Sequence, residues 1–155
     1  MAVPKSITGA VGLWQGKSKL NLPWLAPEKR VTESNSSLHI ETDSQGKFAT
    51  ITYDWHYEGK REEGTIIVAK SGKTNAVQFG WVDSWHQNDG VLHLKGEDSG
   101  TGPVKAKGEY SAGAKEVWGW TIEISPTKDG LTVKMENVPP TGEPMWAVEA
   151  VYKRP

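Results

Sequence analysis

The sequence lacks cysteine, long apolar runs and an excess of charge of either sign. Without Cys, the chain has no disulfide, no thiolate metal site and no cysteine nucleophile. No stretch approaches roughly 18 uninterrupted apolar residues, and the start MAVPKSITGAVG lacks the basic and then apolar segments of a secretory signal. We therefore expect a cytoplasmic protein with no membrane partner.

The charged residues nearly balance. Eighteen Lys and Arg face 19 Asp and Glu, which leaves a formal net charge of -1. Such a chain has no basic field to attract a phosphate backbone, so we expect no nucleic-acid partner. The length of 155 residues, with 36% hydrophobic and 24% charged residues, is typical of one soluble domain over residues 1–155. The unusual feature is eight Trp against two Phe.

Turn signals recur along the chain and separate short segments of alternating hydrophobicity. Gly46, Gly59, Gly72, Gly90 and Gly130 belong to such turns. The segments between turns run about eight to twelve residues and are rich in Val, Ile, Thr, Tyr and Trp, which indicates antiparallel strands. We predict an all-β fold: a single antiparallel up-and-down β-barrel of about ten strands, with a two-sheet sandwich as the alternative.

The segment 23–35 breaks this rhythm. Its sequence is PWLAPEKRVTESN, and Pro27 could open a short helical turn there. We expect either a lid or a long connection after the first strand.

Side chains two positions apart share one face of a strand, which allows the inner face to be assigned. This parity directs most of the Trp residues inward, while His39, His56, His86 and His93 fall on the polar side. The candidate ligand-binding residues on the inner face are Trp55, Tyr57, Phe79, Trp81, Trp85, Trp118, Trp120, Tyr110, Met135, Asn137 and Trp146. Their rings either line a hollow that holds one small hydrophobic or aromatic molecule or fill the barrel completely.

Asp83 has the same inward parity as its aromatic neighbours. There its carboxylate either gains hydrogen-bond partners or becomes a proton donor or acceptor near neutral pH. Alternatively, it lies at the end of its strand and faces solvent or accepts amides of the SWHQNDG turn. His86 follows three residues later and would approach Asp83 only through a bulge or the turn.

Two functions therefore remain open. The first is binding of one hydrophobic or aromatic ligand in a Trp-lined cavity. The second is a small cofactor-independent isomerase, cyclase or lyase, with Asp83 as general acid or base and Tyr53 as a hydrogen-bond donor. No His or carboxylate spacing matches a metal site, and the sequence does not predict the oligomeric state.

The stretch GLWQG around Trp14, together with Arg154 at the end of the last strand, resembles the signature of lipocalin-like (calycin) barrels. The resemblance implies that Trp14 plugs one end of the barrel under Arg154. The segments WVDSWH, EVWGWTIEI and AVEAVYKR resemble the DUF1579 family of small bacterial β-barrels along nearly the whole chain. Related nitrobindin-like barrels hold haem through a C-terminal His, whereas the last His here is His93, so we expect no cofactor.

Overall fold

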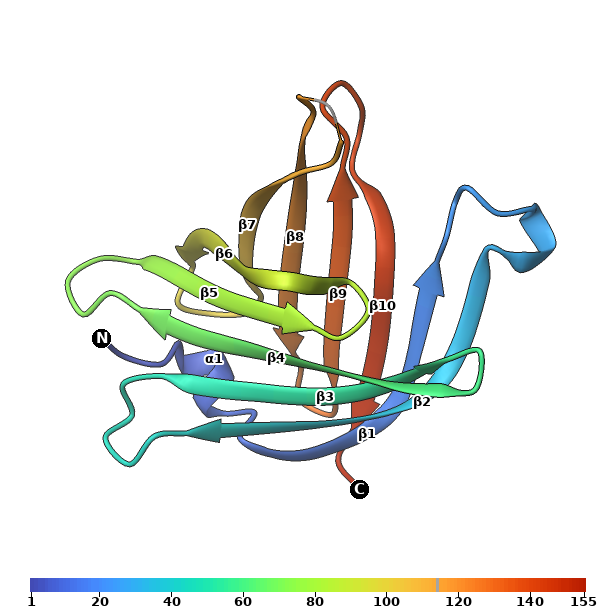
Figure 1. The fold of residues 1–155 in the computed structure, drawn as a ribbon. Helices are drawn as coiled ribbons and strands as arrows, with labels where there is room; N and C mark the ends of the chain where they lie inside the picture. Colours follow the sequence, from blue (N-terminus) through green and yellow to red (C-terminus); the bar gives the residue numbers. More distant parts are fainter. Residues whose placement is uncertain (114) are drawn as a thin grey trace.

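The computed structural model describes residues 1–113 and 115–155 and folds them into ten antiparallel strands around one core (Figure 1). The strands are β1 (Gly12–Asn21), β2 (Val31–Thr42), β3 (Ala49–Tyr57), β4 (Lys60–Lys70), β5 (Ala76–Asp83), β6 (Gln87–Asp98), β7 (Val104–Ser111), β8 (Val117–Pro126), β9 (Leu131–Val138) and β10 (Met145–Lys153).

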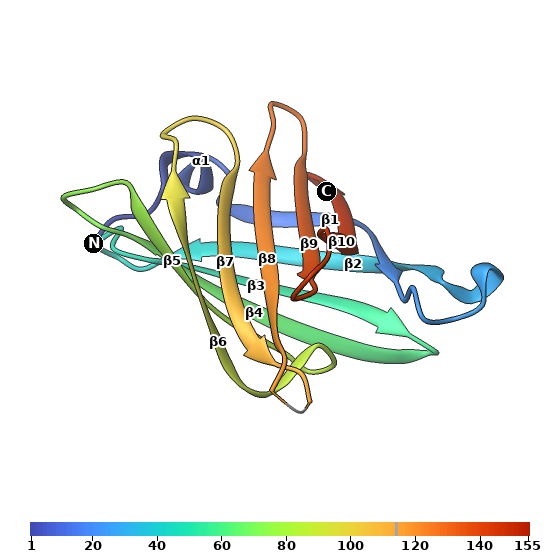
Figure 2. The same ribbon diagram turned by 90° about the horizontal axis from the view of Figure 1, so that it is seen from above.

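Each strand pairs with its neighbours in sequence, and β1 also pairs with β10, which closes the sheet into a barrel. The predicted up-and-down barrel is confirmed, and the sandwich alternative is wrong. Figures 1 and 2 show β2 to β5 crossing β7 to β10 on the opposite side of the barrel, as the twist and tilt of a closed sheet require. Closure gives each of the ten described strands two neighbouring strands.

One end of the barrel is closed by Trp14 and Arg154. The Trp14 Nε1 donates to the carbonyl of Ala10 at 2.8 Å, and the Arg154 guanidinium lies 4.1 Å from the centre of the indole. Arg154 Nη1 also donates to the carbonyl of Val11 at 2.8 Å. Gly12 has a φ of 125°, and a Cβ there would come within 2.6 Å of Arg154 Nη1. The expected Trp14–Arg154 closure is thus confirmed.

A short helix that the sequence pattern did not predict covers this closed end. Helix α1 (Lys5–Thr8) has only four residues, which is too short for a helical period to be visible in the sequence. Its Ile7 is completely buried in the core. The closed end is therefore sealed by α1 in addition to the two stacked side chains.

The connection from β1 to β2 lies at the other end and projects beyond the barrel in Figure 1. It contains the 3-10 helix η1 (Pro27–Lys29), so the helical turn expected at Pro27 is confirmed. The amide of Leu22 donates to the carbonyl of Arg30 at 2.7 Å, which ties the two sides of the connection together. Among residues 1–113 and 115–155, no helix has the length and apolar character needed to cross a membrane.

Candidate functional site

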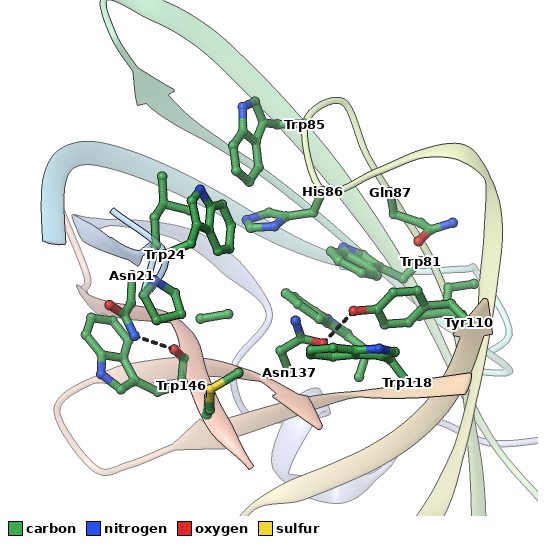
Figure 3. Close-up of a pocket in the computed structure, with 16 residues that line it drawn as sticks. Asn21, Trp24, Trp81, Trp85, His86, Gln87, Tyr110, Trp118, Asn137 and Trp146 are labelled. Carbon is green, nitrogen blue, oxygen red and sulfur yellow. Dashed lines mark hydrogen bonds between the residues drawn. The ribbon is translucent and has the colours of Figure 1, made fainter. Parts of the chain in front are cut away.

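A cavity of about 270 Å³ opens at the end of the barrel opposite Trp14. We call it the mouth cavity. Its lining comes from the end of β1 and the following connection, the β5–β6 turn, and strands β5 to β10. The lining residues are Asn21, Leu22, Pro23, Trp24, Trp81, Trp85, His86, Gln87, Leu92, Tyr110, Trp118, Trp120, Asn137, Met145, Trp146 and Ala147. Figure 3 shows the labelled members of this set arranged around the opening.

Strands β6 and β7 pair over only part of their length. Their ladder runs from Lys95 opposite Lys107 to Asp98 opposite Val104. Leu92 of β6 and Tyr110 of β7, which both line the mouth cavity, lie beyond this ladder. The unpaired parts of both strands therefore contribute to the cavity wall.

Aromatic rings form much of the cavity wall. Trp81 and Trp120 stack with ring centres 5.1 Å apart and an interplanar angle of 11°. Trp85 meets the ring of His86 edge to face at 4.8 Å. Such flat, rigid side chains provide apolar contact area with little loss of conformational freedom.

A second, much smaller space lies deeper in the barrel. This inner void of about 20 Å³ has room for about one water molecule. It is lined by Ser18, Leu20, Leu38, Tyr53, Trp55, Asp83, His86, Val133, Met135, Val148, Ala150 and Tyr152. His86 borders both spaces. The barrel is thus hollow at its open end and nearly filled below it.

Asp83 is buried, and four hydrogen bonds hold its carboxylate. Oδ2 accepts from Tyr53 Oη at 2.7 Å and from Trp55 Nε1 at 3.3 Å. Oδ1 accepts from the backbone amides of Trp85 and His86, both at 2.9 Å. Asp83 therefore joins the inner face of the barrel to the turn after β5. The hydrogen bonds from the turn amides are those that one of the sequence-based alternatives predicted.

Tyr53 connects Asp83 to Trp81. Its hydroxyl donates to Asp83 and accepts from Trp81 Nε1 at 2.9 Å. Burial, and then the nearby charge of Asp83, raise the pKa of Tyr53 well above its ordinary value, so the hydroxyl keeps its proton. Gly64 on β4 lies directly against this ring, where a Cβ would come within 2.1 Å of the hydroxyl oxygen. The bare backbone of Gly64 thus makes room for the tyrosine.

His86 does not lie on the polar side where parity placed it. The β5–β6 pairing shifts between Trp81 and Asp83, and the turn 84–86 follows at once. The chain thereby turns the His86 ring inward, where it stacks on Trp55 at 5.3 Å. Burial lowers the pKa of His86 to about 4 despite the opposing carboxylates of Asp83 and Glu62, so the ring is neutral at neutral pH. His39, by contrast, is partly exposed, and His56 and His93 are exposed.

The candidate residues divide between the two spaces. Trp81, Trp85, Tyr110, Trp118, Trp120, Asn137 and Trp146 line the mouth cavity. Tyr53, Trp55, Asp83 and Met135 line the inner void. Phe79 is completely buried in the packed core, and Tyr57 meets Trp85 edge to face at 5.6 Å. Parity identifies an inward side chain but gives no depth along the barrel, which explains the misplacement of Phe79.

Trp146, expected on the inner face, borders the mouth cavity and also a groove on the outside of the barrel that Lys134 and Glu136 line. A register shift between Trp146 and Val148 pairs Trp146 with Glu136, whose carboxylate meets Lys105 Nζ at 3.2 Å. The inward alternation expected through Val148 is therefore interrupted. Trp146 is half-buried at the rim, where its carbonyl accepts from Asn21 Nδ2 at 2.9 Å.

Sequence reasoning missed Trp24, Asn21, His86 and Glu62. Trp24 lies in the β1–β2 connection, where strand parity does not apply, and Asn21 is the last residue of its strand. Glu62 is only 4% exposed and accepts a hydrogen bond from Ser84 Oγ. Its inward position could have been found from Ile66 and Val68, which share its parity on β4.

Metal binding finds no support in the described part of the chain. No group of three or more His, Asp or Glu is close enough to hold a metal ion among residues 1–113 and 115–155. The carboxylates that are buried near the site are engaged by neutral donors and by Lys60.

The barrel is similar to a solved structure described as "Crystal Structure of Rv2717c from M. tuberculosis". The TM-score is 0.64 at 17% sequence identity, and the match covers 100% of this chain and 99% of that chain, which shows a shared fold. No curated protein matches the sequence. The model of the family described as "Protein of unknown function (DUF1579)" matches residues 5–154. The chain therefore belongs to the DUF1579 family.

Proposed function

We propose that this protein binds one small aromatic or otherwise apolar molecule in the mouth cavity. The observation that carries the proposal is an unfilled space of about 270 Å³ bounded by the indoles of Trp24, Trp81, Trp85, Trp118 and Trp120. Interiors of proteins are normally packed to crystal density, so a space of this size at one end of a well-packed barrel favours an occupant.

The volume limits the size of the ligand. An engineered apolar cavity of about 150 Å³ in another protein binds benzene, whereas many ligand pockets span roughly 300–1,000 Å³. The mouth cavity, at about 270 Å³, falls between these values. It suits a molecule of one or two fused rings.

A rough affinity follows from the buried area. Removing roughly 150 Å² of apolar ligand surface from water contributes about 4 kcal/mol. Two or three contacts with aromatic rings add about 0.5–1.5 kcal/mol each. The sum, about 5–8.5 kcal/mol, corresponds to a dissociation constant between roughly 0.5 and 200 µM. Calorimetry is well suited to that range.

Catalysis by Asp83 and Tyr53 stays a prediction, and the contacts favour binding. Both carboxylate oxygens of Asp83 already accept hydrogen bonds from the protein. Asp83 and Tyr53 border the inner void, which has space for about one water, and they are separate from the residues of the mouth cavity. A general acid or base must reach the proton that it transfers.

Isothermal titration calorimetry with naphthalene and indole tests the proposal. The matched variants are Trp118→Ala and Val117→Ala, because Trp118 lines the cavity and its exposed neighbour Val117 does not. We expect binding by the unchanged protein and by Val117→Ala, and about tenfold weaker binding by Trp118→Ala. No heat of binding with either compound, or equal affinities in the two variants, would contradict the proposed function.

A further inference from the structure

Two side chains in the wall of the mouth cavity, Asn137 and Trp120, carry N–H groups that have no acceptor among the described residues. We propose that the ligand is uncharged and presents a hydrogen-bond acceptor, such as a carbonyl oxygen, to the side chains of Asn137 and Trp120. This inference rests on the proposed function.

Tyr110 fixes the orientation of the Asn137 amide. Its hydroxyl donates to Asn137 Oδ1 at 2.5 Å, so the amide oxygen is occupied and the NH₂ group points the other way. Figure 3 shows this nitrogen directed toward the cavity, on the side away from Tyr110. Burial raises the pKa of Tyr110, so its hydroxyl stays protonated and continues to donate. Within the described part of the chain, no acceptor is paired with Asn137 Nδ2.

Trp120 supplies a second donor on the same face. It lies directly opposite Asn137 in the β8–β9 ladder, and directly opposed residues have Cβ atoms about 5 Å apart on one face of the sheet. Its Nε1 is buried and has no hydrogen-bond partner among the described residues. An indole N–H can only donate, so the missing partner is an acceptor. Asn137 Nδ2 is reached from the cavity directly, whereas contact with Trp120 Nε1 requires a small rearrangement of the wall.

The charge of the wall restricts the ligand further. The described residues that line the mouth cavity include no Lys, Arg, Asp or Glu. His86 is neutral because burial holds its pKa at about 4. A charged ligand would lose its hydration without gaining an ionic partner, which disfavours anions and cations alike. The pair of N–H donors then selects neutral acceptors among compounds of equal shape.

Three compounds of nearly equal shape test this selection by calorimetry on the whole chain. Acetophenone carries a carbonyl where α-methylstyrene carries a methylene group, and benzoate carries a charged carboxylate. We expect acetophenone to bind about tenfold more tightly than α-methylstyrene, because it alone of these two accepts the donated hydrogens. We expect benzoate to bind more weakly than both.

Two variants place the donors. Asn137→Asp keeps the size of the side chain and replaces the NH₂ group by oxygen, and Trp120→Phe keeps a ring without the N–H. In Asn137→Asp we expect acetophenone and α-methylstyrene to bind with about equal affinity. In Trp120→Phe we expect the ratio of the two affinities to decrease. The exposed Asn35→Asp is the matched control and should keep the full preference.

The outcomes separate this inference from the proposed function. Equal affinities for acetophenone and α-methylstyrene in the unchanged protein would overturn the inference and leave an apolar receptor. Benzoate binding most tightly, or a preference that persists in both variants, would also overturn it. If none of the three compounds binds and naphthalene and indole do not bind either, the proposed function itself fails. The comparison in the unchanged protein needs no variant to fold.

Discussion

Replacing Asp83 by Asn is expected to lower the free energy of unfolding by roughly 3–5 kcal/mol. The new amide keeps one oxygen for the backbone amides of Trp85 and His86. Its NH₂ group, however, cannot accept from Tyr53 Oη or Trp55 Nε1, which now meet Oδ2 at 2.7 and 3.3 Å. Hydrogen bonds to charged groups contribute about 1.5–3 kcal/mol each, and the longer one is counted at the low end.

Urea denaturation followed by tryptophan emission measures this loss. Domains have total stabilities of about 5–15 kcal/mol and urea m-values of about 1–3 kcal/mol/M, so the midpoint should fall by about 2 M. Asp129→Asn, in an exposed turn, is the control and should change the stability by less than about 0.5 kcal/mol. A midpoint shift below about 0.5 M in Asp83→Asn would refute the stabilising contribution assigned to the bonds from Tyr53 and Trp55. The affinity of folded Asp83→Asn for naphthalene should change little, since Asp83 does not line the mouth cavity.

Three further predictions concern the same end of the barrel. The pKa of His86 is about 4 in the folded protein, compared with an ordinary value of 6.5. Between these two pH values the unfolded chain binds more protons than the folded chain. The free energy of unfolding should therefore fall by roughly 3 kcal/mol from pH 7 to pH 4 because of this group. Urea titrations of His86→Leu across that range should lack this part of the pH dependence, and an unchanged pH profile would contradict the burial argument. Gly64→Ala places a Cβ 2.1 Å from Tyr53 Oη and should destabilise by roughly 3 kcal/mol in thermal unfolding, whereas Gly80→Ala, whose nearest contact is at 3.8 Å, should be tolerated much better. Trp24→Ala should change the free energy of unfolding by less than about 0.5 kcal/mol because Trp24 is 70% exposed. It should nevertheless weaken naphthalene binding several-fold in calorimetry, since Trp24 lines the mouth cavity. An unchanged affinity would show that Trp24 does not belong to the site.

The barrel could be predicted from the sequence because its signals are local. Alternation at period two gave the inner faces of β3 and β5, and the recurring Gly turns separated the strands. The resemblance to a family signature implied the Trp14–Arg154 closure. Its prediction required only the parity of the first and last strands. Helix α1 escaped prediction because four residues show no helical period.

The site was less predictable because it depends on irregularities. The register shifts after Trp81 and Trp146 change which side chains face inward, and no sequence pattern marked either one. His86 was therefore placed outside, although it stacks on Trp55 within the barrel. The depth of a residue along the barrel also requires the register of neighbouring strands, which decided that Phe79 is core and Trp81 lines the cavity.

The closed end also determines where the chain can be joined to something else. Ala2 pairs with Lys70, and Arg154 stacks on Trp14, so the first and last residues of this chain both leave the barrel on the side away from the mouth cavity. A fluorescent domain or a surface tether fused at either end would leave the entrance unobstructed. The natural indoles around the mouth cavity would then act as built-in fluorescent reporters in a test of the proposed binding.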